Sequence, residues 1–138
     1  MNYAGDVDPT EAWKRLSENE RSVLVDVRSE AEWSFVGIPD LTGIGKRPLF
    51  LSWQIYPSMT ENRGFVDGLA KAVTDKDTPL YFICRSGGRS RAAAIMATAA
   101  GYRHCYNVAD GFEGNPDAAR HRGRIAGWKA AGLPWTQD

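Results

Sequence analysis

Short apolar runs along the chain alternate with segments whose apolar residues recur at helical spacing. Three runs, at residues 22–27, 80–83 and 104–108, have the length and composition of short strands. A weaker run at 49–51 can form another strand. The run at 80–83 contains no charged or turn-forming residue, as is typical of a parallel strand that is covered on both faces.

The predicted helices fall between these strands. Asp8 can cap a helix and Pro9 suits its first position, so we predict a helix that ends at Asn19 and Glu20. Glycine and proline residues end the other helical segments. The remaining predicted helices cover residues 29–35, 64–74 with Asn62 as its cap, 92–100 with Gly101 as its C-terminal cap, and 125–131.

This alternation of strands and helices predicts an α/β fold with a mainly parallel sheet. The chain has 138 residues and no internal repeat or linker, so residues 1–138 are predicted to form a single domain. Residues 40–64 are rich in glycine and proline and are expected to be mostly loop. We expect Trp53 to pack on the sheet edge, the alternative being that this stretch covers an active site. Residues 114–123 are expected to form a solvated surface loop.

Charge and hydropathy narrow the class of protein. Lys plus Arg and Asp plus Glu both number 17, and a net charge of zero disfavours a nucleic-acid partner. No segment reaches the roughly 18 consecutive apolar residues of a membrane span, and residues 1–8 lack the features of a signal peptide. We therefore expect a soluble, cytoplasmic protein that binds neither nucleic acid nor membrane.

Cysteine usage also bears on the chemistry. Cys84 and Cys105 form neither a Cys-x-x-Cys pair nor a Cys/His cluster with zinc spacing. Two cysteines do not make a disulfide framework, which fits a reducing compartment. We therefore predict no metal site and no cofactor.

Cys84 follows the predicted buried strand at 80–83 and precedes a short glycine-containing loop. Ligands of open parallel sheets bind at the carboxyl ends of the strands, where Cys84 is predicted to lie. Gly87 and Gly88 let the loop curl because glycine tolerates positive φ, and a curled loop can point its N–H groups at an anion. A helix that begins near Ser90 adds its positive end.

Arg85 and Arg89 add positive charge to the same segment. Positive charge, a helix N-terminus and backbone N–H donors all favour the thiolate form of a cysteine, which is its nucleophilic form. We interpret residues 84–90 as an anion pocket with a reactive sulfur at its base. The alternative is an inert buried cysteine beside a glycine turn, but such a cysteine does not require this combination of neighbours.

The segment resembles the active-site loop of the rhodanese family, in which a cysteine, four residues, an arginine and a Ser or Thr follow a strand. Cys84, Arg89 and Ser90 match that pattern. The resemblance extends over nearly the whole chain. The other matching segments are Val25-Asp26-Val27-Arg28, Glu30-Ala31-Glu32-Trp33, Gly101-Tyr102-Arg103, Asp110-Gly111-Phe112, and Gly127-Trp128 through Gly132-Leu133-Pro134.

The resemblance implies a three-layer α/β domain with a five-stranded, mainly parallel sheet and helices on both faces. It also implies a sulfurtransferase of the thiosulfate:cyanide type that works without a cofactor. In this reaction the thiolate of Cys84 takes the outer sulfur of a small donor such as thiosulfate. An acceptor such as cyanide, a thiol or a protein cysteine then removes that sulfur from the persulfide.

The resemblance and the chemistry together imply roles for individual residues. Cys84 is the nucleophile, and Arg85 at the pocket mouth holds a sulfonate-like donor group. Arg89 either binds substrate or pairs with a carboxylate such as Asp26 to fix the loop. Asp26 and Arg28 are expected to support the loop or a neighbouring turn. The predicted substrate-binding residues are Arg85, Ser86, Gly87, Gly88, Arg89 and Ser90.

Two other functions fit parts of this pattern. Cell-cycle phosphatases and arsenate reductases of the same fold have one residue more between cysteine and arginine, which widens the loop. The four residues between Cys84 and Arg89 favour sulfur transfer instead. Non-catalytic rhodanese-like modules bind a partner protein and typically lack the cysteine or the loop, whereas this chain has both.

The chain departs from the family pattern at two places. Gly37-Ile38 lacks the histidine that many members carry between these two residues. Cys105 stands where the family usually has an aliphatic strand residue, so we expect it to be a core residue. A resolving cysteine for a disulfide step is the alternative.

Overall fold

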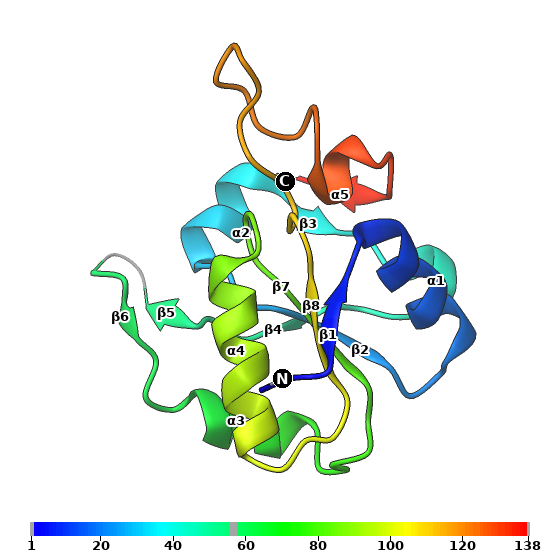
Figure 1. Cartoon of the computed structure of the whole chain (residues 1–138), viewed down its shortest axis with the longest axis vertical. Helices are drawn as coiled ribbons and strands as arrows, with labels where there is room; N and C mark the ends of the chain where they lie inside the picture. The colour runs from blue at the N-terminus through cyan, green and yellow to red at the C-terminus, as the bar shows by residue number, and fades with distance from the viewer. Residues whose placement is uncertain (1, 56–57, 138) are drawn as a thin grey trace.

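The computed structural model describes residues 2–55 and 58–137 of the chain, in which strands and helices alternate (Figure 1). The helices are α1 Pro9–Glu18, α2 Glu30–Val36, α3 Phe65–Ala72, α4 Gly88–Ala99, α5 Gly127–Ala130 and the 3-10 helix η1 Thr42–Ile44. The strands are β1 Gly5–Val7, β2 Val23–Asp26, β3 Ile38–Pro39, β4 Leu49–Phe50, β5 Gln54–Ile55, β6 Thr60–Glu61, β7 Leu80–Ile83, β8 Cys105–Val108 and β9 Trp135–Thr136. Within these ranges, no helix has the length and apolar composition needed to cross a membrane.

Five strands form a parallel sheet in the order β1-β8-β7-β2-β4. β7 lies in the middle, where Leu80 pairs with Cys105 of β8 and Phe82 pairs with Val25 of β2. Every residue of β7 is buried, as expected of a central parallel strand. β3 pairs with β9, and β5 with β6, in two small antiparallel sheets. The predicted α/β fold with a five-stranded, mainly parallel sheet is confirmed.

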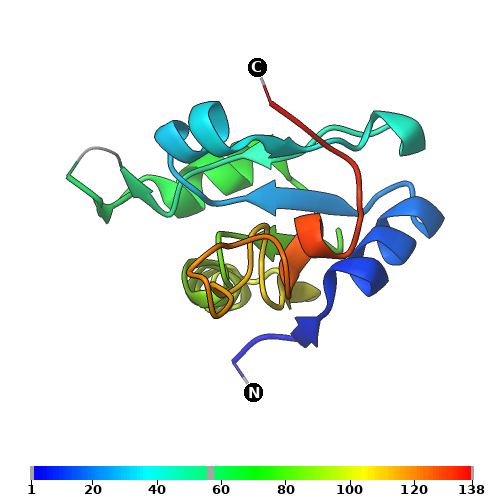
Figure 2. The ribbon, with the colours of Figure 1, turned by 90° about the horizontal axis from the view of Figure 1, so that it is seen from above.

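Side chains that alternate along the central strands build a hydrophobic cluster on each face of the sheet. On one face, Phe82 packs with Leu69 of α3 and with the alanines of α4. On the other face, Ile83 packs with Leu16 of α1 and Trp128 of α5. α1 and α5 lie side by side in both views, and α4 lies on the opposite side of the strands from α1 (Figures 1 and 2). Helices thus cover both faces.

The predicted elements are present, but several of their ends differ. α4 begins at Gly88, slightly before the predicted start near Ser90, so the helix starts inside the glycine loop. The prediction that Asn62 caps α3 is wrong. Gly64 occupies the N-cap position, and no side chain makes a capping hydrogen bond there. Instead, Asn62 Oδ1 accepts a hydrogen bond from the Gly64 N–H, and its Nδ2 donates to the carbonyl of Ser52. The pattern did not predict β1, β3, β5, β6 or β9, each of two or three residues.

The 40–64 stretch contains η1, β4 and the β5–β6 hairpin rather than loop alone. The ring of Trp53 lies edge-on to that of Phe65, with centroids 5.1 Å apart, and packs against the cluster that faces α3 and α4. The prediction that Trp53 packs against the sheet is confirmed. Tyr56 and Pro57, which belong to the same stretch, lie outside the described residues.

Candidate active site

Cys84 directly follows β7 at the carboxyl edge of the sheet. Along β7, Tyr81 and Ile83 face α1 and α5, whereas Leu80 and Phe82 face α3 and α4. The same alternation turns Cys84 toward α3 and α4, at the position where α4 begins. The residue is only 1% exposed, so its sulfur is buried.

The loop after Cys84 closes around the sulfur atom. Gly87 has a φ of +113°, and its N–H donates a hydrogen bond to Cys84 Sγ over 3.1 Å. Gly88 is already the first residue of α4, so Gly87 alone provides the positive φ expected of both glycines. Oγ of Ser90, in the first turn of α4, lies 3.2 Å from Sγ. The loop therefore presents a backbone donor, a hydroxyl and a helix N-terminus to one sulfur atom.

Arg89 holds this loop against α2 through a two-pronged ion pair. Its Nη1 and Nη2 atoms donate to the two carboxylate oxygens of Glu32 over 2.6 and 2.9 Å, and the two side chains are 19% and 18% exposed. Burial raises the pKa of Glu32, but the hydrogen bonds and charge of Arg89 outweigh it and lower that pKa to about 2. The expected carboxylate partner of Arg89 is present, but it is Glu32 rather than Asp26, which pairs with Arg28.

Asp26 and Arg28 form a second ion pair at the end of β2, and both residues are fully buried. Arg28 Nη2 donates to Asp26 Oδ2 over 2.7 Å and to the carbonyl of Gly37 over 2.8 Å. The guanidinium lies 4.3 Å from the centre of the Phe112 ring. Neither charge could stay buried without the other. The contacts of this pair fix the corner between α2 and β3.

The turn that follows β8 packs against the backbone of the cysteine loop. The N–H of Phe112 donates to the carbonyl of Cys84 over 2.8 Å, and that of Glu113 donates to the carbonyl of Arg85 over 3.0 Å. Gly111 has a φ of +62°, and a Cβ atom there would lie 2.4 Å from the Cys84 carbonyl oxygen. This close approach of two backbones requires glycine.

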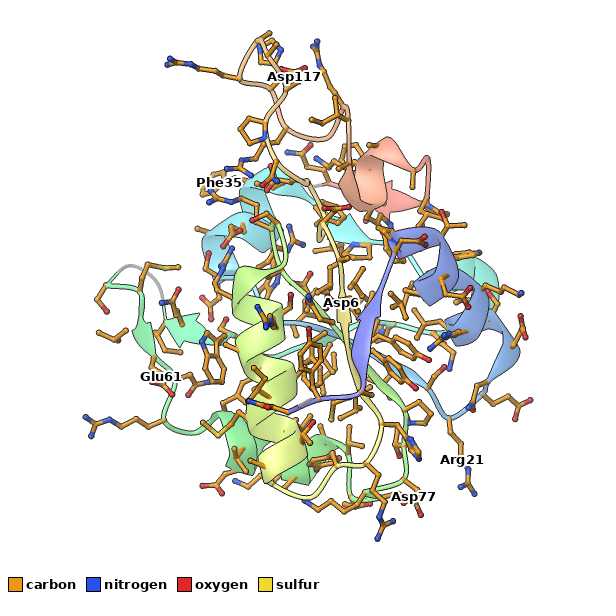
Figure 3. All side chains as sticks on the ribbon, viewed as in Figure 1. Asp6, Arg21, Phe35, Glu61, Asp77 and Asp117 are labelled. Carbon is orange, nitrogen blue, oxygen red and sulfur yellow. The ribbon has the colours of Figure 1, made fainter. Side chains whose placement is uncertain are left out.

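The other residues considered from the sequence lie farther out. Arg85 is exposed and Ser86 is half-buried, while His104 and His121 are both exposed. The 114–123 segment stands out from the body of the protein, with Asp117 near its tip (Figure 3). In residues 2–55 and 58–137, no three His, Cys, Asp or Glu side chains lie together as they would in a metal site.

Two polar residues of the site received no role from the sequence. Glu32 follows Ser29 in a capping box of α2, a pattern visible in the sequence that predicts only a local contact. Asn107 is 5% exposed on β8, and its Oδ1 lies 2.6 Å from Oγ of Ser90. A polar side chain in a buried strand needs a partner, and this was the available signal for Asn107.

Comparison with known proteins identifies the family. The family model described as the STR4 middle domain matches residues 5–138. The thiosulfate sulfurtransferase GlpE of Pseudomonas savastanoi pv. phaseolicola is 31% identical over 105 residues, which cover 76% of this chain and 81% of GlpE. The chain belongs to the rhodanese-like family.

Two relatives are more similar to this rhodanese-like chain than GlpE is. The crystal structure of Rv0390 from M. tuberculosis superposes with a TM-score of 0.91 at 50% identity and covers 99% of both chains. A Rickettsia rickettsii protein named "Uncharacterized protein RP600 homolog" is 43% identical over 127 residues, which cover 91% of this chain and 92% of that protein. Neither name states an activity.

Proposed function

We propose that this rhodanese-like chain is a sulfurtransferase that carries sulfane sulfur as a persulfide on Cys84. The observation that carries the proposal is the Gly87 N–H, which donates to Cys84 Sγ over 3.1 Å at the N-terminus of α4. A backbone donor and a helix N-terminus both favour negatively charged sulfur. Kinship with a thiosulfate sulfurtransferase supports the same class of reaction.

The reaction consists of two displacements at sulfur. In the first, the Cys84 thiolate attacks the outer sulfur of thiosulfate and forms a bond between Sγ and that sulfur. The sulfur–sulfur bond of the donor breaks, and sulfite leaves with the electron pair. In the second, cyanide, a small thiolate or a protein cysteine attacks the outer sulfur of the persulfide. The Sγ–S bond breaks, and Cys84 is released as the thiolate.

Arg89 and Arg85 take different parts in this reaction. Both Nη atoms of Arg89 already donate to Glu32, so this side chain holds the loop and keeps a positive charge near Cys84. In a phosphatase the corresponding guanidinium would have to face the substrate. The exposed Arg85 is the residue we assign to the sulfonate end of the donor. We assign the outer sulfur of the persulfide to backbone N–H groups of the loop from Arg85 to Ser90.

The chemistry also bears on the compartment. Cys84 and Cys105 are both free cysteines. A cysteine that cycles between thiolate and persulfide needs surroundings that do not lock it in a disulfide. We therefore place the protein in a reducing compartment and expect the cytoplasm.

Formation of thiocyanate from thiosulfate and cyanide tests the proposed reaction. We expect turnover in the parent protein and in Cys105→Ser, because Cys105 is buried within β8. Cys84→Ser should show none above background, and no variant should hydrolyse an aryl phosphate. Turnover that survives in Cys84→Ser would contradict the mechanism. A folded parent that transfers no sulfur would favour a partner-binding module, and aryl phosphate hydrolysis alone would favour a phosphatase.

A further inference from the structure

A chain of hydrogen bonds runs from the sulfur of Cys84 to β1. Oγ of Ser90 lies 3.2 Å from Cys84 Sγ and 2.6 Å from Asn107 Oδ1. Nδ2 of Asn107 donates to Oδ1 of Asp6 over 3.0 Å, and the hydroxyl of Tyr3 donates to the same oxygen over 2.8 Å. Asp6 and Asn107 are register partners on neighbouring strands, and Figure 3 shows Asp6 at β1.

The direction of each hydrogen bond follows from which atoms carry hydrogen. A carboxylate only accepts, so Asp6 fixes the Asn107 amide with Nδ2 toward itself and Oδ1 toward Ser90. Burial and the hydrogen bond to Asp6 raise the pKa of Tyr3, so the phenol keeps its proton and donates it. Two oxygen atoms 2.6 Å apart need a hydrogen between them, and the amide oxygen has none. The Ser90 hydroxyl lies within donating distance of both Cys84 Sγ and Asn107 Oδ1 but carries only one hydrogen, and the shorter contact assigns that hydrogen to Asn107 rather than to Cys84.

We propose that Asn107, oriented by Asp6, is a positioning residue that keeps the Ser90 hydroxyl hydrogen away from Cys84. In the resting thiol, the S–H group donates to the Ser90 oxygen. When Cys84 loses its proton to solvent, a lone pair of that oxygen faces the negative sulfur, and the Gly87 N–H is left as the donor. This inference rests on the proposed sulfur transfer and deepens it.

The arrangement favours the persulfide over the free thiolate. When sulfur is taken up, the negative charge moves from Sγ to the outer sulfur, and Sγ becomes a neutral bonded atom. The unfavourable contact between Sγ and the Ser90 oxygen is then relieved. A thiolate that is stabilised by one donor fewer is also the stronger nucleophile, because nucleophilicity falls as stabilisation of the thiolate increases. Both effects promote the first displacement.

Removal of the Asn107 carbonyl tests the proposal because it releases the Ser90 hydrogen. Asn107→Leu has a similar volume and no acceptor, so Ser90 can donate to Cys84. We expect the midpoint of the pH dependence of Cys84 alkylation by iodoacetamide to fall by about one pH unit. The limiting alkylation rate at high pH should fall roughly two- to threefold. All proteins carry Cys105→Ser, so that Cys84 is the one remaining cysteine.

Two further variants separate the hydrogen-bond effect from a packing effect. In a Ser90→Ala background there is no hydroxyl to release, so Asn107→Leu should leave the midpoint where Ser90→Ala alone puts it. Asp6→Asn replaces a carboxylate that can only accept by an amide that can also donate, so the Asn107 amide is no longer held in one orientation and can turn over. The midpoint should fall here as well, and because Asp6 is exposed, this variant serves if Asn107→Leu does not fold.

Other charged groups lie on the elements around Cys84 and Tyr3, and none of them changes in Asn107→Leu. They are Arg85 and Arg89 of the loop, Glu32 of α2, Asp26 and Arg28 at the end of β2, Asp110 of the turn after β8, Asp6 of β1 and Arg91 of α4.

The proposal is overturned if the midpoint stays or rises in both Asn107→Leu and Asp6→Asn. It is also overturned if Asn107→Leu lowers the midpoint equally with and without Ser90. Alkylation needs no sulfur donor, so this readout is independent of the proposed function. If the midpoint shifts but the protein transfers no sulfur, the proposal about the hydrogen-bond chain stands and the proposed function is overturned. If the midpoint does not shift but the protein transfers sulfur, the proposed function stands and the proposal about the hydrogen-bond chain is overturned.

Discussion

The two cysteines differ in what surrounds their sulfur atoms, although both are buried. Cys105 lies within β8, its Sγ contacts the carbonyl of Tyr102, and burial raises its pKa. The sulfur of Cys84 instead receives the Gly87 N–H at the start of α4. Burial among apolar groups disfavours the thiolate form of a cysteine, whereas nearby donors favour it. The prediction that Cys105 is a core residue is confirmed.

Arg85 is the residue whose role is easiest to isolate, because its side chain is exposed. Arg85→Ala removes the charge-assisted hydrogen bond that we propose for the sulfur donor, so KM for thiosulfate should rise roughly tenfold while kcat changes little. Its free energy of unfolding should change by less than about 0.5 kcal/mol. Arg63→Ala removes another exposed arginine, before α3, and should leave KM unchanged. An equal rise of KM in both variants would show that net charge, not a contact, is responsible.

At the residue scale, the sequence predicted which site residues lie close together because they are consecutive in the chain. It did not predict the contacts between residues that are far apart in the sequence. Cys84, the glycines and both arginines are contiguous, so their proximity follows directly. The contact of Arg89 with Glu32 joins residues 57 positions apart, and that of Ser90 with Asn107 joins α4 to β8. Such contacts depend on how whole elements pack, which local patterns do not encode.

At the scale of elements, the start of α4 decides the geometry of the loop. Alanine-rich composition marks the interior of this helix from residue 92, and its start was predicted near Ser90, after both glycines. The helix actually begins after the turn at Gly87, whose left-handed conformation lets the loop reverse direction. The earlier start brings Ser90 into the first turn, next to the sulfur.

The turn after β8 supports the loop through a glycine, and this dependence can be measured. Gly111→Ala should lower the free energy of unfolding by about 3 kcal/mol or more and reduce sulfur transfer, because the new Cβ would collide with the Cys84 carbonyl. Gly132→Ala is the matched control. Its φ of +75° is similar, but nothing lies within 4 Å of the added Cβ. It should cost only about 1 kcal/mol. If urea unfolding shows the same loss of free energy of unfolding in both variants, the positive φ rather than the collision determines the cost of the substitution.

The ion pair between α2 and the loop makes stability depend on pH. The pKa of Glu32, about 2, lies below its usual 4.5. The stabilisation is therefore full above the usual value and is lost as pH falls through 4.5 toward 2. Glu32→Gln should lower the free energy of unfolding by about 2 kcal/mol at neutral pH, and this difference should shrink in the acid range.

Glu30→Gln changes an exposed carboxylate in the same turn of α2 and is the control for Glu32→Gln. Its free energy of unfolding should follow the parent's within about 0.5 kcal/mol at every pH. Urea unfolding over a pH series checks both variants. A difference between the parent and Glu32→Gln that is the same in acid and at neutrality would contradict the role given to the ion pair.

At the scale of the whole molecule, the alternation of strands and helices predicted a mainly parallel sheet, and the family resemblance implied its five strands and the helices on both faces. The alternation did not predict β1, whose residues Gly5–Val7 have little strand character of their own. This strand forms because β8 offers an edge, and their pairing sets Asp6 opposite Asn107. The strand that the sequence missed is therefore the one that completes the hydrogen-bond chain behind Cys84.

Contacts with several elements of the fold hold the loop around the buried sulfur of Cys84 in place. The loop around Cys84 is tied to α2 by Arg89, to the turn after β8 by backbone hydrogen bonds, and to β8 through Ser90. Three separate elements thus fix one short segment. A site of this kind is organised before its substrate binds, which suits covalent chemistry at a single atom.

The most direct test of the account is the intact mass of the protein after treatment with thiosulfate, measured beside Cys84→Ser. We expect the parent to gain the mass of one sulfur atom and to lose it again on addition of cyanide. Cys84→Ser should gain nothing, and Cys105→Ser should behave as the parent does. A folded parent that gains no sulfur from thiosulfate or any other sulfane donor, or a gain that persists in Cys84→Ser, would contradict the assignment of the persulfide to Cys84.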